Sequence, residues 1–179
     1  MKRIIILKAG EGRYRLNESG IEETKRLASQ IFILLSGRRC LLTSVFAAPI
    51  ATHLQTASII GGCFNKGKIH GGKYVEVKKL EYLRCSNGET MTLSRVKSIV
   101  RNVTSIPPSG SPDTYAFIFD EVLFNYTVAG IFQKITNQSI PDLDVPGSSE
   151  GFFCEPDHLY RLTHRGDPEE IHMGLTICV

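Results

Sequence analysis

Short runs of consecutive apolar residues alternate along this chain with longer segments whose apolar residues recur at helical spacing. A strand buried on both faces of a sheet needs such an uninterrupted run, whereas a helix lying on a sheet needs only an apolar stripe. Buried strands are predicted at residues 3–7, 40–44 and 115–119. Helices are predicted at residues 19–35, 49–60, 93–103 and 122–136. This alternation predicts an α/β three-layer sandwich, with a mostly parallel sheet and helices on both faces.

Local signals indicate where these elements end. Ser19 and Glu22 have the S-x-x-E spacing of a helix capping box, and Gly37 stands where a glycine often ends a helix. The pair Gly61-Gly62 is expected to end the second helix. Residues 105–113 and 142–150 have the composition of loops, 73–82 are expected to be a strand or an extended segment, and 152–164 a terminal strand or hairpin. The tail, 171–179, shows no decisive pattern.

Composition narrows the class of protein. Hydrophobic residues make up 42% and charged residues 22% of the 179 positions, which is typical of a folded domain, and one domain over residues 1–179 is expected. No apolar run approaches the roughly 18 residues that span a bilayer, and the apolar stretch after the first three residues is too short for a signal peptide. We therefore expect a soluble, cytoplasmic protein. The net charge of +3 is spread along the chain, so no nucleic-acid partner is expected.

The cysteines fit the same compartment. There are five of them, an odd number, and no two are separated by only two residues. They are Cys40, Cys63, Cys85, Cys154 and Cys178. We expect all five to be reduced thiols.

The loop after the first predicted strand carries the most informative pattern. The strand 4–7 runs into Lys8-Ala9-Gly10-Glu11. This segment resembles the opening signature of the histidine phosphatase (phosphoglycerate mutase-like) superfamily, in which a strand runs into Arg-His-Gly-Glu. Lys8 stands in place of the arginine and Ala9 in place of the histidine, while Gly10 and Glu11 match the signature.

Further segments resemble the same family in the same order, so that the resemblance covers most of residues 3–135. Residues 16–20 are similar to its Leu-Thr-x-x-Gly helix start. Thr43-Ser44 and Gln55-Thr56-Ala57 resemble two parts of its Thr-Ser-x-Leu-x-Arg-Ala and Gln-Thr-Ala region, but not in one ungapped register. The second arginine of the family therefore falls on Ala48 or on Thr52. The resemblance implies the phosphoglycerate mutase-like fold.

Two acidic residues complete this comparison. Glu81, in Leu80-Glu81, resembles the region where the family's acid catalyst can lie. Glu121, at the end of 116–121, falls on the family's second histidine. Because ligands of open α/β sheets bind at the carboxyl ends of the strands, we expect all these loops to meet at one edge. There Lys8 is expected to face Glu121.

The resemblance implies chemistry that these substitutions remove. In the family, a histidine attacks phosphorus, two arginines and a second histidine stabilise the phosphoryl oxygens, and an acid protonates the leaving group. Ala9 has no nucleophilic atom, and neither Ala48 nor Thr52 carries a charge. A carboxylate at Glu121 would repel a phosphate by about 4 kcal/mol per charge pair at 4 Å and an effective dielectric constant near 20. The sequence therefore predicts a catalytically inactive protein.

The expected remnant of the active site is a pocket without a cofactor. Its residues are Lys8, Ala9, Gly10, Glu11, Arg13, Ser44, Ala48, Thr52, Glu81 and Glu121. We expect a binding or regulatory module with an unidentified protein or small-molecule partner. The alternative is a divergent phosphatase or other hydrolase that uses Glu81 and Glu121, with or without His53 on the second predicted helix.

Two metal sites are considered and not favoured. Cys154 and His158, with His164 and His172 nearby, lack the second ligand pair of a zinc finger. Asp120, Glu121 and Glu81 could form an Mg²⁺-binding carboxylate cluster, but solvated side chains at strand ends are the simpler interpretation.

Overall fold

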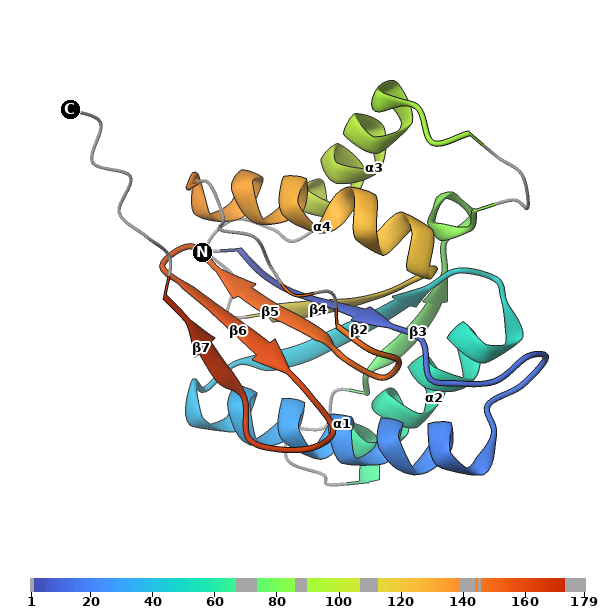
Figure 1. Ribbon diagram of the computed structural model, residues 1–179. Coiled ribbons are helices and arrows are strands. Elements are labelled where there is room, and N and C mark those ends of the chain that lie inside the picture. The colour runs from blue at the N-terminus through green and yellow to red at the C-terminus, as the bar shows by residue number, and fades with distance from the viewer. Residues whose placement is uncertain are drawn as a thin grey trace.

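A computed structural model describes residues 2–66, 74–85, 90–106, 113–138, 144 and 146–172. In these residues seven strands form one sheet, with helices above and below it (Figure 1). In chain order the elements are β1 (Arg3–Lys8), α1 (Glu18–Gly37), β2 (Leu41–Ala47), α2 (Ala51–Lys66), β3 (Glu76–Lys79), the 3₁₀ turn η1 (Glu81–Leu83), α3 (Leu93–Ser105), β4 (Asp113–Phe119), α4 (Glu121–Thr136), β5 (Gly151–Glu155), β6 (His158–Leu162) and β7 (Glu169–Ile171).

The strand order places β1 in the middle of the sheet. The order is β3-β2-β4-β1-β5-β6-β7. The pairs from β3 to β1 are parallel, whereas those from β1 to β7 are antiparallel, so five of the seven strands point the same way. After β1 the chain moves outward to β2 and β3, and then returns to place β4 beside β1. This reversal of direction makes the carboxyl ends of β1 and β4 a topological switch point, where ligands of open α/β sheets bind.

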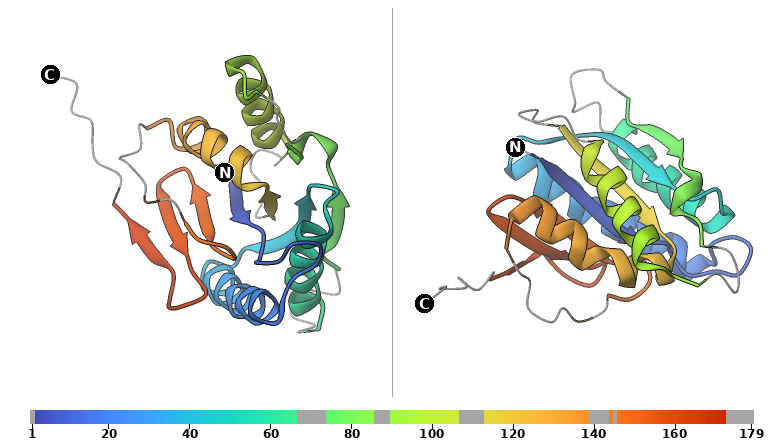
Figure 2. Two further views of the ribbon diagram at one scale, coloured as in Figure 1. Left: turned by 45° about the vertical axis from the view of Figure 1, so that its right-hand side comes forward. Right: turned by 90° about the horizontal axis from the view of Figure 1, so that it is seen from above.

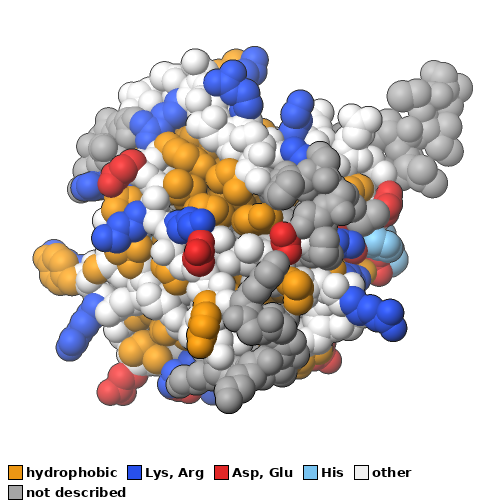
Figure 3. Space-filling model, turned by 180° about the vertical axis from the view of Figure 1, so that it is seen from behind, with side chains coloured by type: hydrophobic (Ala, Val, Ile, Leu, Met, Phe, Trp, Pro, Cys, Tyr) orange, Lys and Arg blue, Asp and Glu red, His pale blue; other side chains and the backbone are white. Residues whose placement is uncertain are grey.

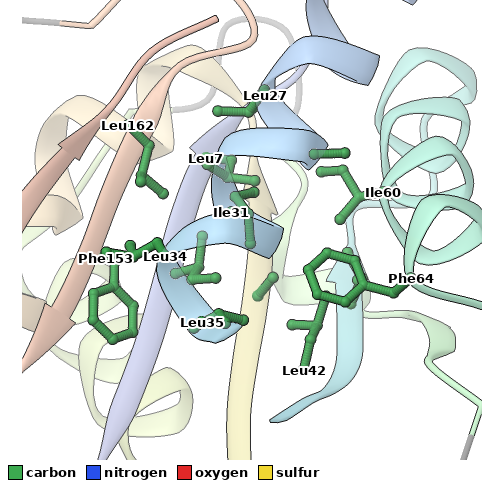
Figure 4. Packing of buried hydrophobic residues seen from close by; sticks show 14 of the residues in the cluster. Leu7, Leu27, Ile31, Leu34, Leu35, Leu42, Ile60, Phe64, Phe153 and Leu162 are labelled. Carbon is green, nitrogen blue, oxygen red and sulfur yellow. The ribbon is translucent and has the colours of Figure 1, made fainter. Parts of the chain in front are cut away.

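Successive residues of β1 point to opposite faces of the sheet and join two separate cores. Ile5 and Leu7 lie in the core under α1 and α2, whereas Ile4 and Ile6 lie in the core under α3 and α4. Figure 4 shows side chains of α1, α2 and several strands meeting in the first core. The labelled members are Leu7, Leu27, Ile31, Leu34, Leu35, Leu42, Ile60, Phe64, Phe153 and Leu162.

Aromatic rings fill much of the second core. Phe132 of α4 packs edge-on against Phe152 of β5, with ring centroids 5.3 Å apart. Phe46 of β2 stacks on Phe117 of β4 at 5.0 Å. The two views in Figure 2 show α4 lying along the sheet and α3 standing farther out against α4. The predicted three-layer α/β sandwich is therefore confirmed.

Several predicted element ends shift in the structure. The capping box at Ser19 and Glu22 is replaced by Asn17, whose side chain accepts a hydrogen bond from the amide of Gly20 at 2.7 Å. Gly37 is the last residue of α1 rather than the residue after it. The pair Gly61-Gly62 lies inside α2, because the helix continues to Lys66 with Phe64 buried in the core. The hairpin expected at 152–164 is present as β5 and β6.

The positive charges on one face of the molecule are dispersed. On the face shown in Figure 3, Lys and Arg side chains are scattered around a patch of hydrophobic side chains and do not form a stripe. None of the described helices combines the length and the apolar character that a membrane crossing requires.

Candidate functional site

The carboxyl ends of four parallel strands meet at one edge of the sheet. Leu7 and Ala47 both pair with Ile118, and Ala47 also pairs with Lys79. The residues that follow therefore lie side by side at the switch point and next to it. They are Lys8 and Ala9 after Leu7, Ala48 after β2, Leu80 and Glu81 after β3, and Asp120 and Glu121 after β4.

The expected ion pair between Lys8 and Glu121 is present at this edge. The Nζ atom of Lys8 lies 3.1 Å from Oε1 of Glu121. The Lys8 side chain is 5% exposed, whereas that of Glu121 is 74% exposed. Lys8 follows Ile4 and Ile6 on the α4 face, and its Nζ lies 5.5 Å from the ring centre of Phe124, in a cation–π position. The buried ammonium group of Lys8 therefore lies between the ring of Phe124 and the solvent-exposed carboxylate of Glu121.

Ala9 and Gly10 begin a loop that is fastened to two neighbouring elements. Ala9 is half-buried on the face of α1 and α2, and its carbonyl accepts a hydrogen bond from the amide of Ser149 at 3.2 Å. The amide of Gly10 donates to Oγ1 of Thr56 in α2 at 3.0 Å. A Cβ at Gly10 would lie 2.9 Å from Thr24 Oγ1 and 3.0 Å from Ser149 Oγ, which explains the glycine. Tight packing here fixes the backbone beside Lys8.

Thr52 and His53 lie in the first turn of α2, and both are buried. Oγ1 of Thr52 is 3.2 Å from Nδ1 of His53, while Nε2 of His53 is buried and has no hydrogen-bond partner in the described part of the chain. Burial lowers the pKa of His53, and the charge of Asp120 and the carbonyl of Phe119 offset part of this effect. His53 is therefore a neutral ring close to the end of β4.

Ser44 does not belong to this edge, contrary to the prediction. β2 does not end near Ser44 but continues to Ala47, and Ser44 pairs with Tyr115 deep in the sheet. Three residues lie between Ser44 and Ala48, so their Cα atoms are roughly 13 Å apart along an extended chain. Ala48 directly follows β2, and Thr52 lies in the first turn of α2; both are buried and neither carries a charge.

The remaining predicted residues surround the edge at the surface. Glu81 begins η1 just after β3 and is exposed. Glu11 and Arg13 are exposed on the loop after Gly10, and the guanidinium of Arg13 lies 5.2 Å from the ring centre of Tyr14. Among the described residues, Lys8 is the one positively charged group that forms an ion pair with Glu121.

The residues considered for metal binding lie apart from one another. Cys154 is buried in the aromatic core, whereas His158 pairs with Glu170 at 2.7 Å on the surface. His164 lies 3.8 Å from Glu23 and 3.9 Å from Glu150. The part of the chain that the structure describes holds no group of three His, Cys, Asp or Glu side chains positioned for a metal ion.

A buried polar cluster behind the Ala9 loop was not predicted. Glu150 is buried, accepts a hydrogen bond from the amide of Gly147 at 2.8 Å and lies 3.7 Å from Nη2 of Arg161. Its backbone carbonyl accepts the amide of Lys8 at 2.9 Å. The cluster therefore supports the loop directly. Sequence patterns give no signal for it because its members come from distant segments.

Comparisons with known proteins agree with this architecture. Neither a protein-family model nor a curated protein matches the sequence. Solved structures match along nearly the whole chain. A phosphoglycerate mutase from Plasmodium falciparum has a TM-score of 0.56 at 14% identity, over 97% of this chain and 90% of that one. The chain has the phosphoglycerate mutase-like fold.

Two other solved structures lead to the same fold. A phosphoserine phosphatase from Entamoeba histolytica, solved with 3-phosphoglyceric acid, has a TM-score of 0.56 at 14% identity, over 99% of this chain and 98% of that one. A protein described as mycobacterial hydrolase 1 has a TM-score of 0.55 at 13% identity, over 96% and 97% of the two chains. Similarity at such low identity establishes the fold and leaves the chemistry to the residues of this chain.

Proposed function

We propose that this protein is a pseudoenzyme of the histidine phosphatase fold and acts as a binding or regulatory module. The observation that carries the proposal is the ion pair between Lys8 and Glu121 beside Ala9. Lys8 has an acidic partner from its own chain, so its charge is already satisfied without a phosphate. Ala9 offers no lone pair with which to attack phosphorus.

Electrostatics at the edge also oppose an anion. An incoming phosphate must separate Nζ of Lys8 from Oε1 of Glu121 and then remain near that carboxylate and near Asp120. Ala48 and Thr52, the two candidates for the position of the family's arginine, contribute a methyl group and a buried hydroxyl in place of a guanidinium. Because members of a catalytic set act together, a single remaining cation retains little of the original transition-state stabilisation.

Hydrolysis and anion binding test the proposal together. We expect no hydrolysis of aryl phosphates or phosphohistidine above background, and no increase in melting temperature with millimolar phosphate, vanadate or tungstate. Glu121→Gln should restore some anion-induced stabilisation, because it frees Lys8 and removes the repulsion. Activity should not return with it. Turnover by the unmodified protein would overturn the proposal.

A second function is favoured by one observation, the buried neutral imidazole of His53. A neutral imidazole has a lone pair on one of its two nitrogens, and burial lowers the pKa of His53, which favours this neutral form. In a rerouted hydrolase His53 would be the nucleophile or base, with Glu81 or Glu121 as the acid. Phosphatase activity that disappears in His53→Gln and Glu81→Gln but survives in Glu76→Gln, an exposed carboxylate within β3, would establish this alternative.

A further inference from the structure

An open groove of about 690 Å³ lies between the loop after β1 and the starts of α1 and α2. Its lining residues are Arg13, Tyr14, Arg15, Leu16, Asn17, Glu18, Ile21 and Gln55. A second hollow of about 380 Å³ shares Leu16, Ile21 and Gln55 with it and continues along α2 past Leu54, Ser58 and Ile59. Both volumes fall in the range of about 300–1,000 Å³ that is typical of small-molecule sites.

The two ends of this composite groove differ in chemistry. At one end Arg13 and Arg15 project from the loop, and Glu18 is the single acidic residue among the lining side chains. At the other end the lining side chains are mainly aliphatic, with only Gln55 and Ser58 polar. A ligand that matches both ends has a negatively charged head and an apolar body.

The two arginines have no acidic partner in the described part of the chain. Arg13 contacts the ring of Tyr14, and neither Arg13 nor Arg15 takes part in a recorded ion pair. Both are exposed, whereas Arg3, Arg38 and Arg161 are paired with carboxylates elsewhere in the molecule. Their donors therefore remain available to the carboxylate of a ligand whose apolar body lies in the adjoining hollow.

The loop that carries these arginines is rigidly built. The amide of Leu16 donates to Oε1 of Gln55 in α2 at 2.7 Å, and the amide of Asn17 donates to the carbonyl of Glu11 at 3.0 Å. A Cβ at Gly12 would lie 1.9 Å from the carbonyl oxygen of Arg15, so the turn closes tightly on itself. Gln55 both anchors the turn and lines the two hollows. A ligand therefore meets a surface that is ordered in advance, which lowers the entropy loss on binding.

We propose that this groove binds a small amphipathic organic anion, with its head group between the two arginines and its apolar body along the aliphatic floor. The groove shares Arg13 with the predicted pocket, but neither Lys8 nor Glu121 lines it. The proposal holds whether or not the protein is catalytically inactive, and its test measures no catalysis.

Octanoate is a suitable probe. The comparison compounds are 1-octanol, octyltrimethylammonium and acetate, which lack its charge, reverse its charge or lack its apolar body. Titration followed by amide NMR should show octanoate shifting residues 13–17 and 54–59, with weaker effects of octanol and acetate and none of the cationic amphiphile. Arg13→Gln/Arg15→Gln should weaken octanoate binding about tenfold, the expected effect of losing a charge-assisted hydrogen bond. Ser58→Asp should also weaken it, since it places a carboxylate at the exposed apolar end.

A matched control removes the same two charges elsewhere. Lys97 and Arg101 are exposed on α3, on the opposite side of the sheet, and Lys97→Gln/Arg101→Gln should leave octanoate affinity unchanged. The four basic residues replaced in the two double variants are all exposed. Melting curves check that every variant, including Ser58→Asp, folds. Equal binding of octanol and octanoate, equal effects of the two double variants, or no shifts at these amides at millimolar octanoate would each overturn the proposal.

Discussion

Lys8 and Glu121 form an ion pair whose two members have opposite environments. Their charged atoms are 3.1 Å apart, yet the lysine side chain is 5% exposed and the glutamate side chain 74% exposed. The free-energy penalty for removing a charged group from water therefore arises almost entirely from Lys8. The two residues should consequently respond differently to substitution, although they share one contact.

Stability measurements test this asymmetry. Lys8→Met keeps an unbranched apolar stem on Phe124 and leaves Glu121 in water, so we expect the free energy of unfolding to stay within about 0.5 kcal/mol or to rise. Glu121→Gln leaves a buried ammonium without its carboxylate, and we expect a loss of about 1 kcal/mol, small because water reaches the pair. Urea unfolding measures both. A larger loss for Lys8→Met would mean that the pair stabilises the fold beyond its desolvation penalty.

This ion pair can be predicted from the sequence, because Lys8 ends one buried strand, Glu121 comes shortly after another, and both strands end at the same edge of the sheet. Ser44 is misplaced by the same reasoning. The residues after it, Val45, Phe46 and Ala47, are apolar and continue the strand, and nothing in the local pattern distinguishes them from the start of a helix. Hydrophobic periodicity identifies elements well and their ends poorly, and a strand end decides which residues reach a site.

Contacts between distant segments lie beyond such reasoning. Glu155 is buried between Nε of Arg3 at 3.1 Å and Nε of Arg38 at 3.2 Å. These partners are 152 and 117 residues away in the sequence. No spacing rule connects them, because their proximity depends on β1 pairing with β5. The groove that Arg13, Arg15 and Gln55 line has the same origin, since Gln55 of α2 anchors a turn that belongs to the loop after β1.

Gly151 should tolerate no side chain. A Cβ there would lie 2.0 Å from the carbonyl oxygen of Ile6 and 2.8 Å from Cα of Leu7, and both are backbone atoms of the central strand. We expect Gly151→Ala to lower the free energy of unfolding by about 3 kcal/mol or more, because β1 or β5 must move.

Gly37 provides the matched control for this change. A Cβ at Gly37, the last residue of α1, meets no atom within 4 Å. Gly37→Ala should be neutral or stabilise the protein by up to about 1 kcal/mol, since alanine restricts the unfolded chain. Similar urea midpoints for the two variants would show that β1 and β5 lie farther apart than described.

The two buried thiols should react only when the protein unfolds. Burial and the charge of Glu155 raise the pKa of Cys154 to about 12, and burial also raises the pKa of Cys40. The thiolate is the reactive form, so little of it exists near neutral pH. Alkylation with one isotopic reagent in buffer and a second in denaturant, followed by peptide mass spectrometry, should label both residues in the second step. Rapid labelling of either residue in native protein would contradict this. Cys178 lies outside the described residues.

The buried imidazole of His53 should make stability depend on pH in a defined direction. Burial lowers its pKa below the ordinary 6.5, so the unfolded chain takes up a proton at a higher pH than the folded chain does. As pH falls below about 6.5, the unfolded state binds more protons, and folding stability decreases until the pKa of the folded state is reached. His158 beside Glu170 and His164 beside Glu150 and Glu23 also have carboxylate neighbours, so the contribution of His53 must be isolated from theirs. The informative quantity is therefore the free energy of unfolding of the unmodified protein minus that of His53→Gln, measured from about pH 7.5 to about pH 5.5, where the unperturbed side chain titrates. We expect this difference to decrease as the pH falls. A difference that stays constant would show that His53 titrates alike in both states, and one that increases would show that the folded protein stabilises the imidazolium.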